Sequence, residues 1–116
     1  MKFSITAFAL CLISFQANGA ITTISGKVEK LRLHQMLDNS HWDGQVWFCL
    51  DTTEVVSGCG VTSECGNKNS IMISKDAPKE VYSSVLAARL SNHPISVQLD
   101  DTHKFGDHCY ARVIDL

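Results

Sequence analysis

The cysteines of this chain restrict its folding more than any other feature. Four of the five lie well beyond the N-terminus, at positions 49, 59, 65 and 109. An even number of cysteines in a short exported chain is typical of a disulfide framework. A zinc site would usually contain a Cys-x-x-Cys pair, and this sequence has none. We therefore predict two disulfides, which would stabilise a core that is small for independent folding.

The N-terminal sequence indicates export. Lys2 is followed by the uncharged apolar run "FSITAFALCLISF" and then by the small residues of "QANGA". This is the pattern of a secretory signal peptide, with cleavage between Gly19 and Ala20, and the run is too short to span a bilayer comfortably. We predict a signal peptide over residues 1–19, a single domain over residues 20–116, and a secreted or periplasmic location.

The charge of the predicted mature chain argues against two classes of partner. The full sequence has a formal net charge of −2, and removal of Lys2 with the signal peptide leaves about −3. Nucleic acids and anionic membranes are bound by basic surfaces. We therefore expect neither nucleic acid nor membrane as a partner.

Hydrophobic alternation predicts five strands. The first covers residues 21–33, where the apolar positions change from one face to the other, so we expect a β-bulge near Glu29 or Lys30. The other four are predicted at residues 45–50, 70–74, 95–100 and 109–116.

One helix is predicted between the third and fourth strands. Asp76 is a suitable N-cap, Pro78 fits the first turn, and the apolar residues that follow recur at helical spacing. Asn92 can end the helix in the left-handed conformation, and Pro94 prevents its continuation.

The order of these elements favours a mainly β (α+β) fold. Three strands, a helix and two more strands, with a strongly bent first strand, predict a five-stranded closed barrel of the OB type. Chain order alone also permits other small α+β sheets.

The residues alone leave two disulfide pairings open among the three that four cysteines allow. A Cys49–Cys65 bridge would connect the second strand to the start of the third, and Cys59 would then pair with Cys109. In the alternative, Cys59–Cys65 closes a short local loop and Cys49–Cys109 joins the second and fifth strands.

Catalytic motifs are scarce. Bridging would use the cysteines, and the sequence contains neither a Gly-x-Ser-x-Gly motif nor a glycine-rich phosphate loop. The best candidate metal ligands are Asp100, Asp101, His103, Asp107 and His108 around one turn, although turns select such polar residues anyway. We predict a non-enzymatic protein with no metal or other cofactor. A metal-dependent hydrolase at His103 and His108 is the one specific enzymatic alternative.

The loop "DNSHWDG" carries the best candidate binding residues. An aromatic side chain in a turn often marks a contact surface, and Trp42 would stack on a sugar ring while polar neighbours bind the hydroxyl groups. The candidate ligand site is therefore Asn39, His41, Trp42 and Asp43. In the alternative, which is the commoner role for such a residue, Trp42 folds back over the mouth of the barrel. Trp47 lies on the face opposite the core residues of its strand and is expected to cover a second surface or a subunit interface.

Between Val46 and Leu99 the chain resembles the receptor-binding B subunits of AB5 toxins of the subtilase-cytotoxin and typhoid-toxin type. The shared elements are Phe48-Cys49 at the end of a strand, a cysteine sixteen residues later, "NKNS" before a strand, an aromatic-containing helix and "PISV". The resemblance implies an OB barrel, a Cys49–Cys65 disulfide and a ring of subunits that binds cell-surface glycans. Cys59 and the position of Cys109 are not part of that pattern.

Together these features predict an exported, non-enzymatic binding module whose partner is a cell-surface glycan. The alternative is a periplasmic or secreted structural or inhibitory protein that binds another protein through the same surface. A homo-oligomeric ring is the assembly that the resemblance implies.

Overall fold

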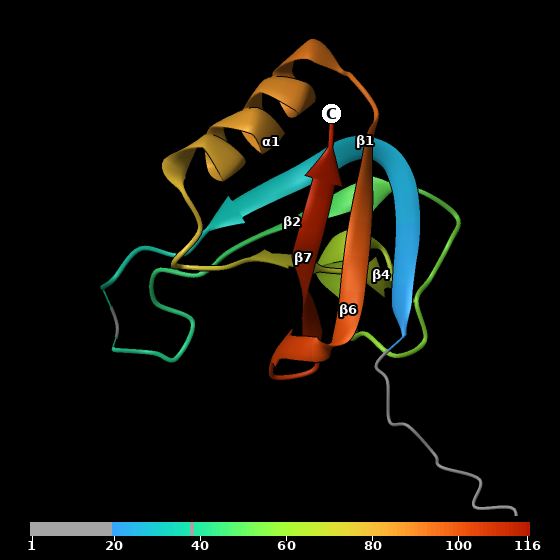
Figure 1. Ribbon diagram of the computed structural model, residues 1–116. Coiled ribbons are helices and arrows are strands. Elements are labelled where there is room, and N and C mark those ends of the chain that lie inside the picture. The colour runs from blue at the N-terminus through green and yellow to red at the C-terminus, as the bar shows by residue number, and fades with distance from the viewer. Residues whose placement is uncertain (1–19, 38) are drawn as a thin grey trace, which may run out of the picture.

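The computed structural model describes residues 20–37 and 39–116, so the predicted signal peptide lies outside the described residues. The fold is mainly β with one α-helix, as predicted (Figure 1). Among these residues no helix is long and apolar enough to cross a membrane. In chain order the elements are β1 (Ile21–Leu33), β2 (Val46–Asp51), β3 (Val61–Thr62), the 3₁₀ turn η1 (Ser63–Cys65), β4 (Lys68–Asn69), β5 (Ile71–Ile73), α1 (Lys79–Ser91), β6 (Ile95–Phe105) and β7 (His108–Asp115).

Five of the strands form one sheet that closes on itself in the order β1-β2-β5-β7-β6. The β1–β2, β1–β6, β2–β5 and β6–β7 pairs are antiparallel, whereas β5 and β7 are parallel and share the single pair Met72 and Tyr110. The sheet is therefore most weakly joined between β5 and β7. β3 and β4 form a separate two-stranded sheet.

The long strand β1 belongs to both halves of the sheet. Its first half, from Ile21 to Gly26, pairs with β6, and its second half, from Lys27 to Leu33, pairs with β2. The register shifts between Val28 and Lys30, which confirms the predicted bulge. A side chain at Gly26 would collide with the backbone carbonyl of Asp51, so the strand needs glycine where it changes partners.

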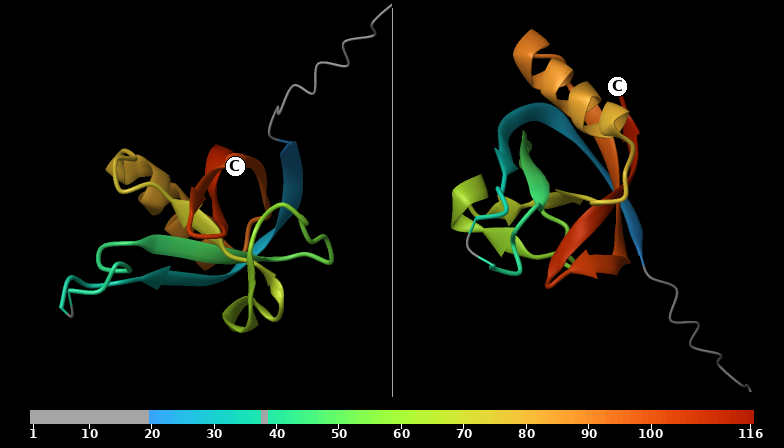
Figure 2. Two further views of the ribbon diagram at one scale, coloured as in Figure 1. Left: turned by 90° about the horizontal axis from the view of Figure 1, so that it is seen from below. Right: turned by 90° about the vertical axis from the view of Figure 1, so that its left-hand side faces the viewer.

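The helix covers one end of the sheet (Figure 1 and Figure 2). Val85 and Ala88 of α1 are buried in the main core. The helix follows β5 and precedes β6, so the prediction that three strands come before it was wrong: five do. β3 and β4 were missed because two residues each are too few to show alternation.

The start of α1 also differs from the prediction. Pro78, not Asp76, is the N-cap, and no side chain caps the helix. The Asp76 N–H donates instead to the Ser74 hydroxyl and the Ala77 N–H to the Ser74 carbonyl, so a turn precedes the helix. Ala77 precedes the proline and is therefore disfavoured in helical conformation, which prevents a helix start at Asp76. The predicted C-terminus is confirmed, since Asn92 adopts the left-handed conformation with φ 57°.

Two disulfides are present, as predicted, and they adopt the first of the two pairings. Cys49 is bonded to Cys65 and Cys59 to Cys109. The first bridge holds η1 against β2, and the second fastens the loop after β2 to β7.

The two faces of β2 contribute to two separate apolar clusters. Phe48 and Leu50 point into the main core inside the sheet, whereas Trp47 and Cys49 belong to a smaller cluster on the outer side. Cys65 and Met72 complete that outer cluster, which is packed against Trp42, Phe105 and Tyr110. Trp47 is only 4% exposed, so it covers a second surface within its own chain and the subunit-interface interpretation was wrong.

Candidate functional site

The strongest candidate site is an open pocket of about 250 Å³ next to the outer cluster. Its walls combine aromatic rings, a pair of opposite charges and hydroxyl groups, which is a mixture that ligand sites use for shape and specificity. The residues that line it are Arg32, His34, Trp42, Trp47, Thr62, Glu64, Ser70 and His108.

The β1–β2 pairing places the back wall of this pocket. Arg32 lies directly opposite Trp47 in the register, and its guanidinium carbon is 5.0 Å from the centre of the indole ring. The Trp47 Nε1–H donates a 2.9 Å hydrogen bond to His34 Nε2. Nε2 of His34 is therefore the hydrogen-bond acceptor in this contact. Both contacts fix the indole, because its polar edge and its face each have a partner.

Trp42 reaches the pocket from the loop between β1 and β2. The Ser40 hydroxyl accepts from the Trp42 N–H at 3.0 Å, and the Ser40 carbonyl accepts from the Asp43 N–H. The indole ring lies 4.9 Å from the Phe105 ring in an edge-on arrangement and 5.2 Å from the His34 ring. The side chain is half-buried, so it both packs against the outer cluster and presents part of its surface to the pocket.

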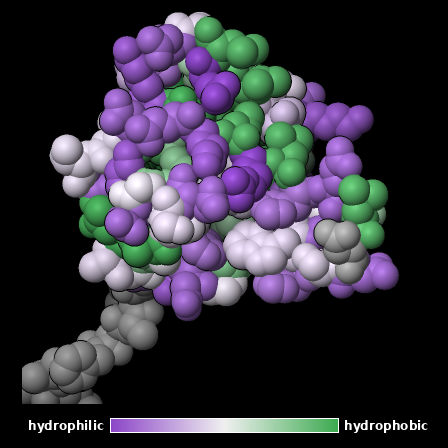
Figure 3. Space-filling view, turned by 180° about the vertical axis from the view of Figure 1, so that it is seen from behind, coloured by the Kyte–Doolittle hydropathy of each residue, from purple (hydrophilic) through white to green (hydrophobic). Residues whose placement is uncertain are grey.

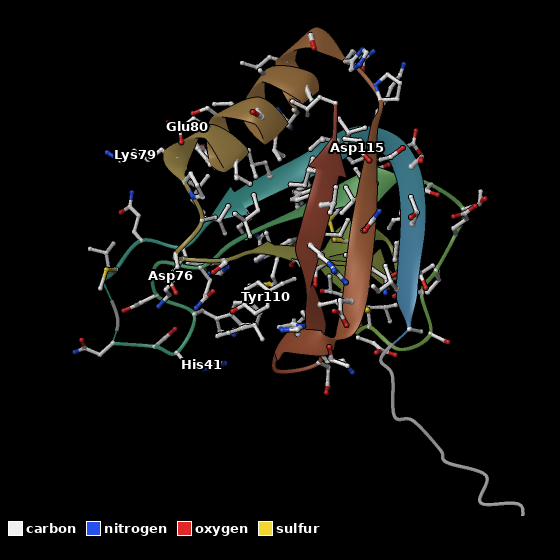
Figure 4. The ribbon with its side chains drawn as sticks, in the orientation of Figure 1. His41, Asp76, Lys79, Glu80, Tyr110 and Asp115 are labelled. Atoms are coloured by element: carbon white, nitrogen blue, oxygen red, sulfur yellow. A yellow bond between two sulfur atoms is a disulfide. The ribbon has the colours of Figure 1, made fainter. Side chains whose placement is uncertain are left out.

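The other three candidate residues lie in the same loop but do not line the pocket. His41 is exposed and stacks on Phe105 at a centroid distance of 5.7 Å, and Figure 4 shows it at the outer edge of the loop. Asn39 is exposed with φ 52°, and Asp43 is half-buried. The structure therefore brings only Trp42 of the predicted set into the pocket.

An ion-pair cluster forms the rim of the pocket. Glu64 of η1 accepts hydrogen bonds at Oε2 from Lys30 Nζ at 3.1 Å and from Arg32 Nη2 at 2.9 Å. The hydrogen bond from Lys30 and the charge of Arg32 lower the pKa of Glu64 below its ordinary value of 4.5. Glu64 is thus an anion over the whole neutral and mildly acidic range.

Ser70 and His108 close the floor of the pocket. The Ser70 hydroxyl and His108 Nδ1 lie 2.5 Å apart and share a hydrogen bond. Ser70 is only 3% exposed, and the His108 ring is 5.8 Å from the Trp42 ring. The pair joins the start of β5 to the start of β7 at the point where the sheet has its weakest connection.

The side chains of the acidic turn that suggested metal ligands do not point to one common site in the structure. His103 Nδ1 lies 3.2 Å from Asp100 Oδ2, whereas His108 faces Ser70. Hydrogen bonds from the Thr102 hydroxyl and N–H, with a smaller effect of His103, lower the pKa of Asp100. No group of three potential metal ligands occurs in the part of the chain that the structure describes. These contacts support the interpretation of the turn as a polar hairpin end.

A second depression, of about 400 Å³, lies between α1 and β7. Its walls are mainly aliphatic, with Ile73, Val81 and Ile114 among them, and it has no aromatic ring. Figure 4 shows Glu80 on the helix near it. It therefore lacks the aromatic face that the pocket at Trp42 and Trp47 presents.

Sequence reasoning missed Arg32, His34, Glu64, Ser70 and His108 as parts of one site. They come from four separate segments, and only strand register and the disulfide bring these together. One signal was present: Trp47 has the parity opposite to the core, so residues across from it on β1 share its outer face.

Comparison of the chain with protein-family models, with curated proteins and with solved structures gave no match.

Proposed function

We propose that this protein is an exported, non-enzymatic binding module of the OB type that recognises carbohydrate through the pocket between Trp42 and Trp47. The observation that carries the proposal is the composition of this pocket. It joins two indole rings with an Arg–Glu pair and hydroxyl groups in a space open to solvent. Aromatic faces bind the apolar face of a sugar, and the polar groups orient its hydroxyls.

The OB assignment is supported by the strand order. The five strands that close the sheet follow one another in the chain as β1, β2, β5, β6 and β7, and the helix lies between the third and fourth of these. The strongly bent β1 pairs with both β2 and β6, which allows five strands to close the sheet (Figure 1).

Export is supported by the signal-like sequence over residues 1–19 and by the two disulfides. Disulfides persist in oxidising compartments, and they hold together the loop that carries the rim of the pocket. A secreted or periplasmic location follows from the proposal.

A binding role without catalysis is supported by the burial of the Ser70–His108 contact in the pocket. Ser70 is almost completely buried and its hydroxyl is held by His108 between two strands, which suits a structural link better than a nucleophile.

The test is a glycan array probed with the processed protein and with Trp42→Ala. We expect the wild type to bind a subset of glycans and Trp42→Ala to lose at least tenfold in affinity, because the indole face contributes the stacking surface. Gln35→Ala is the matched control: the residue is exposed in the same loop and does not line the pocket, so binding by this variant should stay within about twofold of wild type. Array binding that survives unchanged in Trp42→Ala would remove this site, and the absence of any glycan binding would remove the function.

A ring of subunits belongs to the proposal through the resemblance to toxin B subunits. The molecular mass in solution tests it, and a strictly monomeric mass would contradict it.

The second candidate function is binding of another protein. Its support is the exposure of Met36 and Leu37, at 79% and 75%, in the loop that also carries Trp42. Hydrophobic residues elsewhere form separate groups among hydrophilic ones, as Figure 3 shows for the face behind that of Figure 1. A co-purifying protein that is lost in the double variant Met36→Ser, Leu37→Ser, together with no carbohydrate affinity, would favour this function.

A further inference from the structure

We propose that the pocket binds a neutral sugar through two adjacent hydroxyl groups, one held by Arg32 and the other by Glu64. This specificity rests on the carbohydrate-binding function proposed above and goes beyond it by naming the class of sugar and the pair of residues that selects it.

The Arg32–Glu64 pair presents a donor and an acceptor side by side. The ion pair uses Nη2 of Arg32 and Oε2 of Glu64. Among the described residues, no donor contacts Glu64 Oε1 and no acceptor contacts Nε or Nη1 of Arg32. One hydroxyl can therefore accept from the guanidinium while its neighbour donates to the carboxylate, and both hydrogen bonds are charge-assisted.

Both side chains are held in place before a ligand arrives. Arg32 is stacked on Trp47, and the Glu64 carboxylate is shared with Lys30. The backbone around Glu64 is also fixed, because its N–H donates to the Thr62 hydroxyl and the next residue, Cys65, is disulfide-bonded to β2. Such preorganisation reduces the entropy lost on binding.

The same pair disfavours acidic sugars. A ligand carboxylate that approaches Arg32 also approaches the Glu64 carboxylate, which repels it and already offsets part of the positive charge of Arg32 and Lys30. The Lys30 hydrogen bond and the Arg32 charge lower the pKa of Glu64, so Glu64 is an anion at neutral pH, where an acidic sugar is charged as well.

The size of the pocket fits one ring. A volume of about 250 Å³ is below the range of about 300–1,000 Å³ that is usual for drug-sized ligands. The half-buried Trp42 supplies the apolar wall against which the carbon-bound hydrogens of a single sugar ring would pack, while the buried Trp47 lies behind Arg32.

The test is calorimetric titration of the processed protein with three probes. These are methyl glycosides of neutral hexoses, the corresponding methyl glucuronide, and a tetra-O-methyl hexoside that has no hydroxyl donors. We expect at least one neutral hexoside to bind, and the other two probes to bind at least tenfold more weakly.

Two variants then test the residues. Glu64→Gln should weaken neutral hexoside binding at least fivefold and reduce the discrimination against the glucuronide. Glu29→Gln is the matched control, because Glu29 has the same side-chain exposure and a comparable ion pair, with Lys68, but does not line the pocket. It should bind like wild type. Arg32→Lys keeps the charge but loses the planar N–H edge, so it should weaken the neutral hexoside as well.

The outcomes separate this inference from the proposed function. If neutral hexosides bind and Trp42→Ala abolishes their binding, but folded Glu64→Gln and Arg32→Lys bind as wild type does, the hydroxyl-pair inference is overturned and the carbohydrate function stands. Equal affinity of the wild type for the glucuronide and the neutral hexoside would also overturn it. If no probe binds the wild type and the glycan array is also negative, both fail.

Discussion

The side chain of Asn69 replaces secondary structure in the loop between β2 and β3. Its Oδ1 accepts from the Val56 N–H at 2.8 Å, and its Nδ2 donates to the carbonyls of Val56, Cys59 and Gly60. The residue is only 3% exposed. One buried amide therefore binds four backbone groups beside a disulfide cysteine, and one of these groups, the Val56 carbonyl, also accepts from the Cys59 N–H.

Substitution of Asn69 should destabilise the fold. Asn69→Ala leaves four backbone groups without the amide, and we expect a loss of about 2–3 kcal/mol in the free energy of unfolding. Asn69→Asp should cost more at neutral pH, because a carboxylate would face three carbonyl oxygens. Urea denaturation at pH 7 measures both, with the exposed Ser57→Ala of the loop that Asn69 supports as control. Equal stability of Asn69→Asp and wild type would show that the amide donors are not needed.

The role of Trp42 could be predicted from the sequence in part, but the rest of its site could not. Its place in a turn indicated that it was special, and the two interpretations, packing and ligand contact, both describe part of what the half-buried ring does. Its neighbours in the sequence were a poor guide to the rest of the site. Besides its sequence neighbour His41, the rings of His34, Phe105 and His108 lie near it, and only the fold brings these three to it.

Among the elements, the strands and the helix C-terminus were the most predictable, because each has a local cause. Residue parity located the bulge in β1, and Asn92 followed by Pro94 fixed the end of α1. The start of α1 was mispredicted because Ser74 captures the Asp76 N–H in a preceding turn. The short strands β3 and β4 depend on the disulfide-bonded loop around them, and a two-residue strand carries no periodic signal.

A substitution at the bend of β1 should separate steric from conformational effects. Gly26→Ala places a methyl group against the Asp51 carbonyl, and we expect a loss of at least about 2 kcal/mol in unfolding free energy. The methyl group of Gly106→Ala meets no neighbouring atom. This variant should lose only the unfolding free energy that a left-handed φ of 59° costs a residue with a side chain, about 1–2 kcal/mol. Thermal and urea unfolding of both variants give the comparison. A smaller loss for Gly26→Ala than for Gly106→Ala would contradict the close approach of β1 and β2.

For the whole molecule, the prediction of a small, mainly β domain with one helix and two disulfides was confirmed, because cysteine number and hydrophobic alternation are properties of the chain itself. The residues alone left two cysteine pairings open. The fold selects one of the two pairings. Cys65 of η1 packs with Cys49 of β2 in the outer cluster, and the loop after β2 places Cys59 next to Cys109 of β7.

The two disulfides should contribute unequally to stability. Cys59–Cys109 closes a segment of 50 residues and Cys49–Cys65 one of 16, so the first removes more entropy from the unfolded chain. Loop-closure estimates give about 4 and about 3 kcal/mol. Paired serine substitutions at each bridge, followed by denaturant titration, measure the difference. A larger loss for the Cys49–Cys65 pair would show that native contacts of η1, rather than chain entropy, dominate.

The divided pairing of β1 has a consequence for biogenesis. Its first half finds its partner only in β6, near the other end of the sequence, whereas its second half pairs with the next strand along. If the chain is exported as proposed and crosses a membrane from its N-terminus, the first half of this strand would stay unpaired until almost all of the chain had been translocated. Final closure of the sheet would then wait for the C-terminal hairpin, and the same late segment delivers the last cysteine to be oxidised.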